Sequence, residues 1–161
     1  MIFVILGTQD RSFDRLLSEV DNLINKKVII KEVIVQAGKT EYKSKNMKIL
    51  KTVSMKRFNE LIVKSDYIIT HGGVGSILDS LKQNKKVIAV PRLAIYKEHI
   101  NNHQLQIINQ LEKDGYLVGC QEVKNLEECI NFIPDFCPKK YIGNNDRMIN
   151  TIDNFISKIK L

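Results

Sequence analysis

The chain has 161 residues, which fits a single domain spanning residues 1–161, and its 43% hydrophobic content is that of an ordinary globular protein. Its 25 basic and 18 acidic residues give a scattered net charge of +7 without an arginine-rich arm or a basic aromatic stripe, so no nucleic-acid partner is expected. No apolar run approaches the roughly 20 residues of a membrane span, and the three cysteines fit neither a metal pattern nor a disulfide framework, so we expect a reduced, cytoplasmic protein without a metal site.

Strand-like and helix-like segments alternate along the chain. In chain order they predict a strand at 2–6, a helix capped by Ser12, strands at 33–36 and 47–52, a helix beginning at Ser54, a strand at 67–70, a helix at 76–83, a strand at 87–90, a helix at 100–112, a strand at 116–118, and helices at 126–132 and 147–159. This order predicts an α/β fold with a Rossmann-like, doubly wound parallel sheet. Ligands of such folds bind at the carboxyl ends of the strands.

The segment 71–76, His-Gly-Gly-Val-Gly-Ser, lies between a predicted strand and a predicted helix. Glycines let backbone N–H groups approach an anion, and the helix dipole favours negative charge at this end, so the segment predicts a phosphate site. The alternative is a tight turn that binds nothing. Asp79 also has two interpretations, because Ser76 and Asp79 fit a capping box as well as a ligand-binding pair.

A second polar cluster follows the strand at 87–90 and Pro91-Arg92. His99 and His103 are four residues apart but lack the glutamate of a zinc-binding pair, so zinc is not expected. Mixed donors and acceptors suit sugar hydroxyls, whereas the alternative is a polar helix end that faces solvent. The candidate sugar-binding side chains are those of Glu98, Asn102, His103 and Gln104.

Together these motifs resemble the C-terminal domain of glycosyltransferase family 28 from residue 1 to about residue 120. The pattern is His-Gly-Gly-x-Gly-Ser, an acidic residue in the next helix, Val-Pro, and Asn-His-Gln; the opening Ile-Leu-Gly-Thr-Gln adds to it. The chain is most similar to single-domain catalytic halves of split UDP-sugar transferases, found in eukaryotic N-glycan assembly and in bacterial capsule and exopolysaccharide synthesis. The resemblance implies the C-terminal half of a GT-B fold.

The resemblance also implies a role for each matching residue. Asp79 stands where the family usually has glutamate, one methylene longer, for the ribose hydroxyls. The diphosphate would lie against Gly7, Thr8 and Gln9, the phosphate cradle would be Gly72, Gly73, Gly75 and Ser76, and the donor sugar would be held by Asn102, His103 and Gln104.

The implied reaction is the inverting transfer of a hexose from a UDP-sugar to a lipid-linked saccharide in bacterial capsule or exopolysaccharide synthesis. UDP-galactose is favoured as donor and UDP-GlcNAc is second; no cofactor is implied. Because the match covers only the second GT-B domain, a membrane-anchored partner would supply the other half and hold this chain at the inner face of the membrane. The general base is unknown: His71 is the local candidate, but in two-domain relatives the base belongs to the other half.

Two other functions compete with this prediction. A non-catalytic nucleotide-binding or scaffolding subunit would enhance another glycosyltransferase. A nicotinamide dehydrogenase is disfavoured, because residues 7–12 lack Gly-x-Gly-x-x-Gly. The apolar stripe of the helix predicted at 147–159 would pack on its own core or dock a partner or a membrane.

Overall fold

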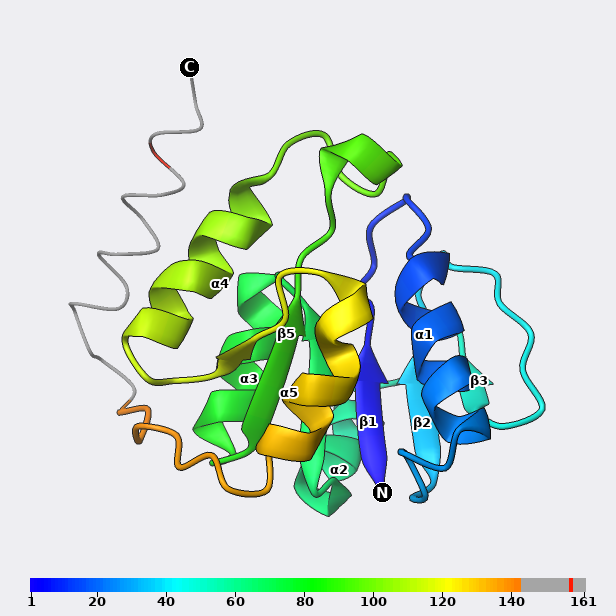
Figure 1. Cartoon of the computed structure of the whole chain (residues 1–161), viewed down its shortest axis with the longest axis horizontal. Coiled ribbons are helices and arrows are strands. Elements are labelled where there is room, and N and C mark those ends of the chain that lie inside the picture. The colour runs from blue at the N-terminus through cyan, green and yellow to red at the C-terminus, as the bar shows by residue number, and fades with distance from the viewer. Residues whose placement is uncertain (143–156, 158–161) are drawn as a thin grey trace.

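A computed structural model describes residues 1–142 and residue 157, and within them the predicted α/β fold is confirmed (Figure 1). One parallel sheet has the strand order β3-β2-β1-β4-β5-β6. The helix predicted at 147–159 lies outside the described residues except for Ser157. The strands are β1 (Ile2–Ile5), β2 (Val33–Gln36), β3 (Lys48–Leu50), β4 (Tyr67–His71), β5 (Lys86–Val90) and β6 (Val118–Gly119).

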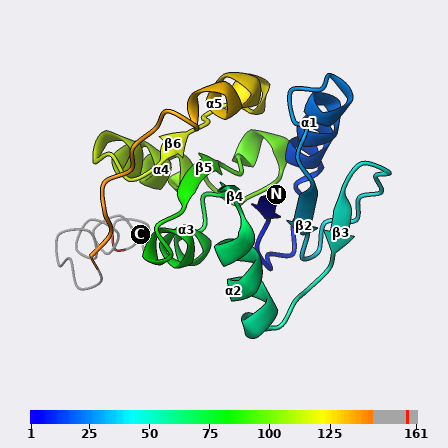
Figure 2. The ribbon, with the colours of Figure 1, turned by 90° about the horizontal axis from the view of Figure 1, so that it is seen from below.

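Helices cover both faces of the sheet, as Figure 2 shows in a view along the strands. One face packs against α1 (Asp14–Asn25) and α5 (Leu126–Phe132), with the short turn η2 (Val123–Asn125) between β6 and α5. The other face packs against α2 (Met55–Lys64), α3 (Val74–Lys82) and α4 (His103–Lys113). A short turn, η1 (Ala94–Tyr96), lies between β5 and α4.

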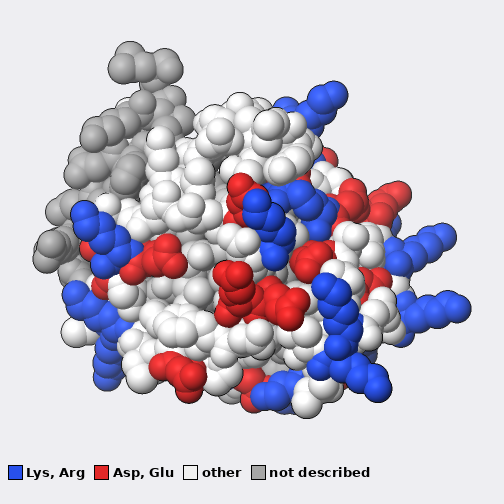
Figure 3. Space-filling view, viewed as in Figure 1, with Lys and Arg blue, Asp and Glu red and all other residues white. Residues whose placement is uncertain are grey.

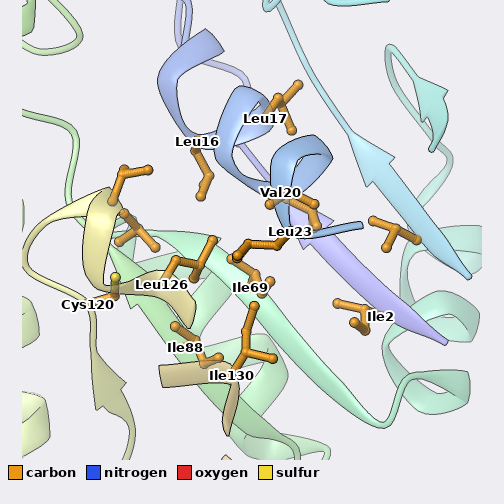
Figure 4. Close-up of a cluster of buried hydrophobic side chains, with 14 of the residues drawn as sticks. Ile2, Leu16, Leu17, Val20, Leu23, Ile69, Ile88, Cys120, Leu126 and Ile130 are labelled. Carbon is orange, nitrogen blue, oxygen red and sulfur yellow. The ribbon is translucent and has the colours of Figure 1, made fainter. Parts of the chain in front are cut away.

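The central strands are buried on both faces, which explains their continuous apolar sequences. Every residue of β1 is buried, with Phe3 and Ile5 directed to one core and Ile2 and Val4 to the other. Figure 4 shows the first core, where leucines of α1 meet Leu126 and Ile130 of α5 above the sheet. These two cores hold the strand ends, and so the loops that follow them, in fixed positions.

Several predicted helix boundaries are wrong, each for a local reason. Helix α1 begins at Asp14 with Phe13 rather than Ser12 at its N-cap, because the Phe13 ring is buried and its N–H donates to Thr40 Oγ1 at 3.0 Å. Helix α3 begins at Val74, so Ser76 lies inside its first turn and the capping-box interpretation fails. The predicted cap Ser54 is confirmed, since its Oγ accepts from the Arg57 N–H.

Helix α4 begins at His103, three residues later than predicted. Its buried face contains Gln104, Ile107, Ile108 and Leu111, whereas Leu105 is only half-buried. Among the described residues, none of the helices has the length and apolarity to span a membrane.

Charged side chains of both signs are mixed over the face shown in Figure 3. The net charge of +7 therefore does not gather into a single basic patch on this face. Strands β1 and β4 are neighbours, while their chains continue to opposite sides of the sheet. This reversal is the switch point at which ligands of doubly wound sheets bind.

Candidate functional site

A cleft of about 470 Å³ opens at the carboxyl edge of the sheet. Three parts of the chain form it: the loop after β1, the turn between β4 and α3, and the segment that enters α2. The lining residues are Gly7, Thr8, Gln9, Gln36, Thr52, Val53, Met55, Phe58, His71, Gly73, Gly75, Ser76 and Asp79.

The His71 side chain fills the space between the two glycine-containing loops. Its Nδ1 lies 3.3 Å from the Ile5 carbonyl oxygen, and the residue is 5% exposed. A Cβ on Gly7 would lie 2.6 Å from the ring and a Cβ on Gly73 2.1 Å from Nε2, so both positions must lack side chains. Burial, and to a lesser degree the nearby Arg92 charge, lowers the pKa of His71 to about 4. The ring is therefore neutral at pH 7.

The first turn of α3 presents free backbone donors to the cleft. Its N-cap is Gly73, which has no side chain to bond the first N–H groups. A Cβ on Gly75 would meet no atom within 4 Å, so the packing of the described protein does not require glycine there. An uncapped helix N-terminus with open space before it is suited to an anion.

Asp79 lies one turn further along α3 and also lines the cleft. Its carboxylate is 39% exposed and lies 3.9 Å from Lys82 Nζ. A contact of this length between exposed groups is weak, so the carboxylate is available to hydroxyl donors of a ligand.

The last residue of β2, Gln36, holds the loop after β1 in place. Gly7 has a φ of +74°, which glycine adopts without strain. Its carbonyl oxygen accepts from Gln36 Nε2 at 3.2 Å, and Gln36 also reaches the Lys51 carbonyl at 3.4 Å. Sequence reasoning missed Gln36; its only signal was an amide at the carboxyl end of an apolar strand.

The remaining wall of the cleft is apolar. Val53, Met55 and Phe58 line it, and the Phe58 ring packs edge-on against Phe3 with centroids 5.6 Å apart. A flat apolar surface beside an anion site can hold an aromatic ring.

The second polar cluster lies beside the cleft rather than along its lining. The Glu98 carboxylate accepts from Arg15 Nε at 2.9 Å and Nη2 at 2.8 Å, and from the Leu93 N–H at 3.1 Å. Asn102 Oδ1 accepts from the Ala94 N–H at 2.9 Å. Glu98 and Asn102 therefore hold the loop between β5 and α4.

Gln104 joins two strand ends. It is 1% exposed, and its Oε1 accepts from the N–H of Gly72 at 3.2 Å and the N–H of Arg92 at 3.0 Å. Gly72, which does not line the cleft, lies against this side chain, since an added Cβ would be 2.6 Å from Gln104 Cβ. The amide thus sets the distance between the turn after β4 and the segment after β5.

One histidine connects the loop after β1 with this cluster, and a second histidine packs against it. His99 Nε2 lies 3.2 Å from the Gln9 side-chain amide, and its ring packs at 77° to that of His103, with centroids 4.6 Å apart. Burial lowers the pKa of both histidines. A second hollow of about 270 Å³ shares Gln9 with the cleft. Within the described chain, no group of three or more His, Cys, Asp or Glu side chains is arranged to hold a metal ion.

The strand order and the uncapped helix beside the switch point define a doubly wound domain of the kind that binds nucleotide phosphates. Solved glycosyltransferases share the fold. SnogD from Streptomyces nogalater matches with a TM-score of 0.57 and 16% identity over 98% of this chain and 40% of its own. Os79 from O. sativa, solved with U2F and trichothecene, matches with a TM-score of 0.60 and 17% identity over 97% of this chain and 36% of its own. An NMR structure of ALG13 has a TM-score of 0.61 and 22% identity over 93% of both chains.

Sequence comparison defines the family. The pattern of the glycosyltransferase family 28 C-terminal domain matches residues 1–149, and the chain belongs to this family. The UDP-N-acetylglucosamine transferase subunit ALG13 of Candida albicans is 33% identical over 109 residues, which are 68% of this chain and 36% of that protein. The human protein of the same name is 41% identical over 61 residues, or 38% of this chain and 5% of that protein. This chain thus spans only a minor part of either curated relative.

The predicted family and GT-B type of fold are confirmed. The bacterial capsule type stays a prediction.

Proposed function

We propose that this chain is the donor-binding subunit of an inverting glycosyltransferase that uses a UDP-sugar. One observation carries the proposal: the uncapped N-terminus of α3, with Gly73 and Gly75, faces a cleft large enough for a nucleotide. Family membership and relatives named as UDP-N-acetylglucosamine transferase subunits support it.

The cleft has a suitable surface for each part of UDP. The amides of Gly73 and Gly75 and the Ser76 hydroxyl would receive the phosphates. The Asp79 carboxylate would accept from the ribose hydroxyls, and Phe58 would lie near the uracil ring. All of these residues line the same cleft.

The reaction would need preorganised donors at the leaving group. An acceptor hydroxyl attacks the anomeric carbon, a new C–O bond forms, and the bond to the β-phosphate oxygen breaks with inversion. The negative charge that develops on UDP would be stabilised by the α3 amides and dipole. The proton of the hydroxyl needs a base whose pKa is near the working pH. Because the pKa of His71 is about 4 and its ring is buried, we assign the base to a partner chain.

The names of the relatives favour one donor. We place UDP-GlcNAc first, because proteins 33% and 41% identical to this chain are named as UDP-N-acetylglucosamine transferase subunits. UDP-galactose, which the sequence resemblance favoured, comes second. We keep as proposals a lipid-linked saccharide acceptor, a membrane-anchored partner subunit that places this chain at the inner membrane face, and a role in capsule or exopolysaccharide synthesis.

Calorimetric titration of the purified chain tests the proposal. UDP, UDP-GlcNAc, UDP-galactose and NAD would each be titrated into the wild type and into Gly75→Ala. We expect UDP and one UDP-sugar to bind, with an affinity about tenfold lower in Gly75→Ala because the new methyl group occupies ligand space. Binding of NAD in preference to UDP would overturn the proposal. Equal binding of UDP by both proteins would show that the ligand does not lie against the N-terminus of α3, on which the proposal depends. A partner-dependent transfer assay would separate a transferase from a scaffold.

A further inference from the structure

Arg92 is a buried cation directly behind the loop that lines the cleft. It follows β5 after Pro91 and has 0% exposure. Its Nη2 donates to the Leu6 carbonyl at 2.8 Å, and its Nη1 donates to the carbonyls of Arg11 at 2.7 Å and Ser12 at 3.1 Å. One of these residues precedes the loop 7–10 and the other two follow it. A single side chain therefore holds both ends of this loop.

The backbone of Arg92 is fixed as well. Its N–H shares Gln104 Oε1 with the N–H of Gly72. Arg92 thus connects the segments that follow β1, β4 and β5 through hydrogen bonds to main-chain atoms or to one buried amide. These are the strand ends around the cleft, including the glycine turn.

Such a cation is costly to bury. Its hydrogen-bond partners are neutral carbonyls, the Phe13 ring lies 4.8 Å from its Cζ, and its Nε has no hydrogen-bond partner among the described residues. Desolvation lowers the pKa of Arg92 to about 10, so the charge is retained at pH 7. An apolar side chain of similar size would avoid this desolvation, but it would leave the carbonyls of Leu6, Arg11 and Ser12 without their donor. The planar fork of N–H donors holds these carbonyls at fixed angles, which neither an apolar side chain nor an ammonium group can do.

We propose that Arg92 is a positioning residue that preorganises the loop 7–9 for the diphosphate of the donor. The identity of the ligand rests on the proposed function, whereas the hydrogen bonds of Arg92 to Leu6, Arg11 and Ser12 do not depend on it. A loop held in its bound conformation loses less entropy when the ligand binds, and this gain appears as affinity.

The test compares Arg92→Met and Arg92→Lys with a control of similar stability. Leu23→Ala is suitable, because Leu23 is fully buried in the last turns of α1 (Figure 4) and contributes nothing to the cleft. UDP affinity is measured by calorimetry. Amide hydrogen exchange is measured without ligand at Leu6 and Phe13, whose N–H groups bond the Gln36 carbonyl and Thr40 Oγ1 at the two ends of the loop. We expect both Arg92 variants to bind UDP at least about tenfold more weakly than Leu23→Ala and to exchange faster at Leu6 and Phe13.

Chemical rescue separates positioning from packing. Arg92→Ala leaves space for a small cation, and we expect methylguanidinium to restore its UDP affinity, whereas methylammonium, which lacks the fork, does not. Arg92→Lys serves as the folded variant if Arg92→Met does not fold. UDP affinity and exchange rates equal to those of Leu23→Ala would overturn the inference. If wild-type protein fails to bind UDP, the proposed function fails instead. Unchanged exchange at Leu6 and Phe13 in the Arg92 variants would separately overturn the bracing role.

Discussion

Two neighbouring regions at the carboxyl edge of the sheet are built in opposite ways. The glycine wall, residues 7–9 and 72–76, presents backbone amides and small side chains, and most of its residues line the cleft. The polar brace, which consists of Arg15, Arg92, Glu98 and Gln104, has large polar side chains that bond other protein groups. The first region leaves the N–H groups at the start of α3 free for a ligand, whereas the second uses its donors and acceptors to hold the first in place.

The difference shows that a polar motif beside a cleft is not by itself a ligand site. Glu98 and Gln104 have the chemistry of sugar-binding residues, yet their oxygens accept from the protein. Gly75 has no functional group at all, yet its position leaves open space beside free amides. Substitutions in the two regions should therefore have separable effects on stability and on ligand affinity.

The largest effect is expected within the glycine wall, at Gly73. Gly73→Ala would place Cβ 2.1 Å from Nε2 of the buried His71 ring, so either the ring or the turn must move. We expect a loss of about 3 kcal/mol of unfolding free energy and of measurable UDP binding. Urea denaturation checks the first and calorimetry the second. Gly75→Ala is the matched control: it should unfold no more easily than wild type, because alanine favours the helix by about 1 kcal/mol. Equal destabilisation by both changes would contradict this account of the wall.

His71 predicts a pH dependence of similar size. Its pKa is about 4 in the folded chain against about 6.5 when unfolded, so the unfolded state binds more protons between these values. The contribution of His71 to the free energy of unfolding is therefore complete above pH 6.5. It is lost as the pH falls towards 4, by up to about 3 kcal/mol. His71→Asn should flatten the slope of unfolding free energy against pH. His103→Gln, at a half-buried histidine, should change this slope less. An identical slope between pH 6.5 and 5 in wild type and His71→Asn would refute the assignment.

Glu98→Gln tests the brace. The change removes a buried charge that forms two hydrogen bonds with Arg15, and we expect stability to fall by about 2 kcal/mol. The ratio of UDP-sugar to UDP affinity should stay the same, because the carboxylate is engaged by Arg15 and Leu93. Arg15→Gln should add little to Glu98→Gln in a double-mutant cycle measured by urea denaturation. A changed affinity ratio with unchanged stability would instead place Glu98 at the sugar.

Asp79→Ala should have the smallest effect on folding. Its carboxylate is 39% exposed, so stability should change by less than about 0.5 kcal/mol. Loss of the ribose contacts should lower the affinity for UDP about tenfold. The affinity of Asp79→Asn, which keeps one acceptor oxygen, should lie between those of the wild type and Asp79→Ala. Calorimetry on the three proteins provides the comparison. Undiminished UDP affinity in Asp79→Ala would remove this residue from the site.

The glycine wall was predictable because its chemistry is local in sequence. A strand followed by His-Gly-Gly-Val-Gly-Ser requires backbone donors at a helix start, whichever residues pack around it. The polar brace was not predictable, because its partners are far apart: Arg15 and Glu98 are separated by 83 residues, and Arg92 and Leu6 by 86. An arginine directly after a buried strand was the available signal for Arg92. For Gln104 the sequence offered a sugar contact or a solvent-facing helix end, because a helical pattern does not show which backbone groups a buried amide bonds.

The central claim is that the donor's phosphates bind to backbone amides of the glycine wall. Amide chemical shifts followed during titration with UDP, and separately with uridine, test it most directly. The account predicts that UDP shifts the amides of residues 7–9 and 73–76, and that uridine, without phosphates, leaves 73–76 unmoved. Shifts confined to residues 98–104, or equal responses of the glycine turn to UDP and uridine, would contradict it.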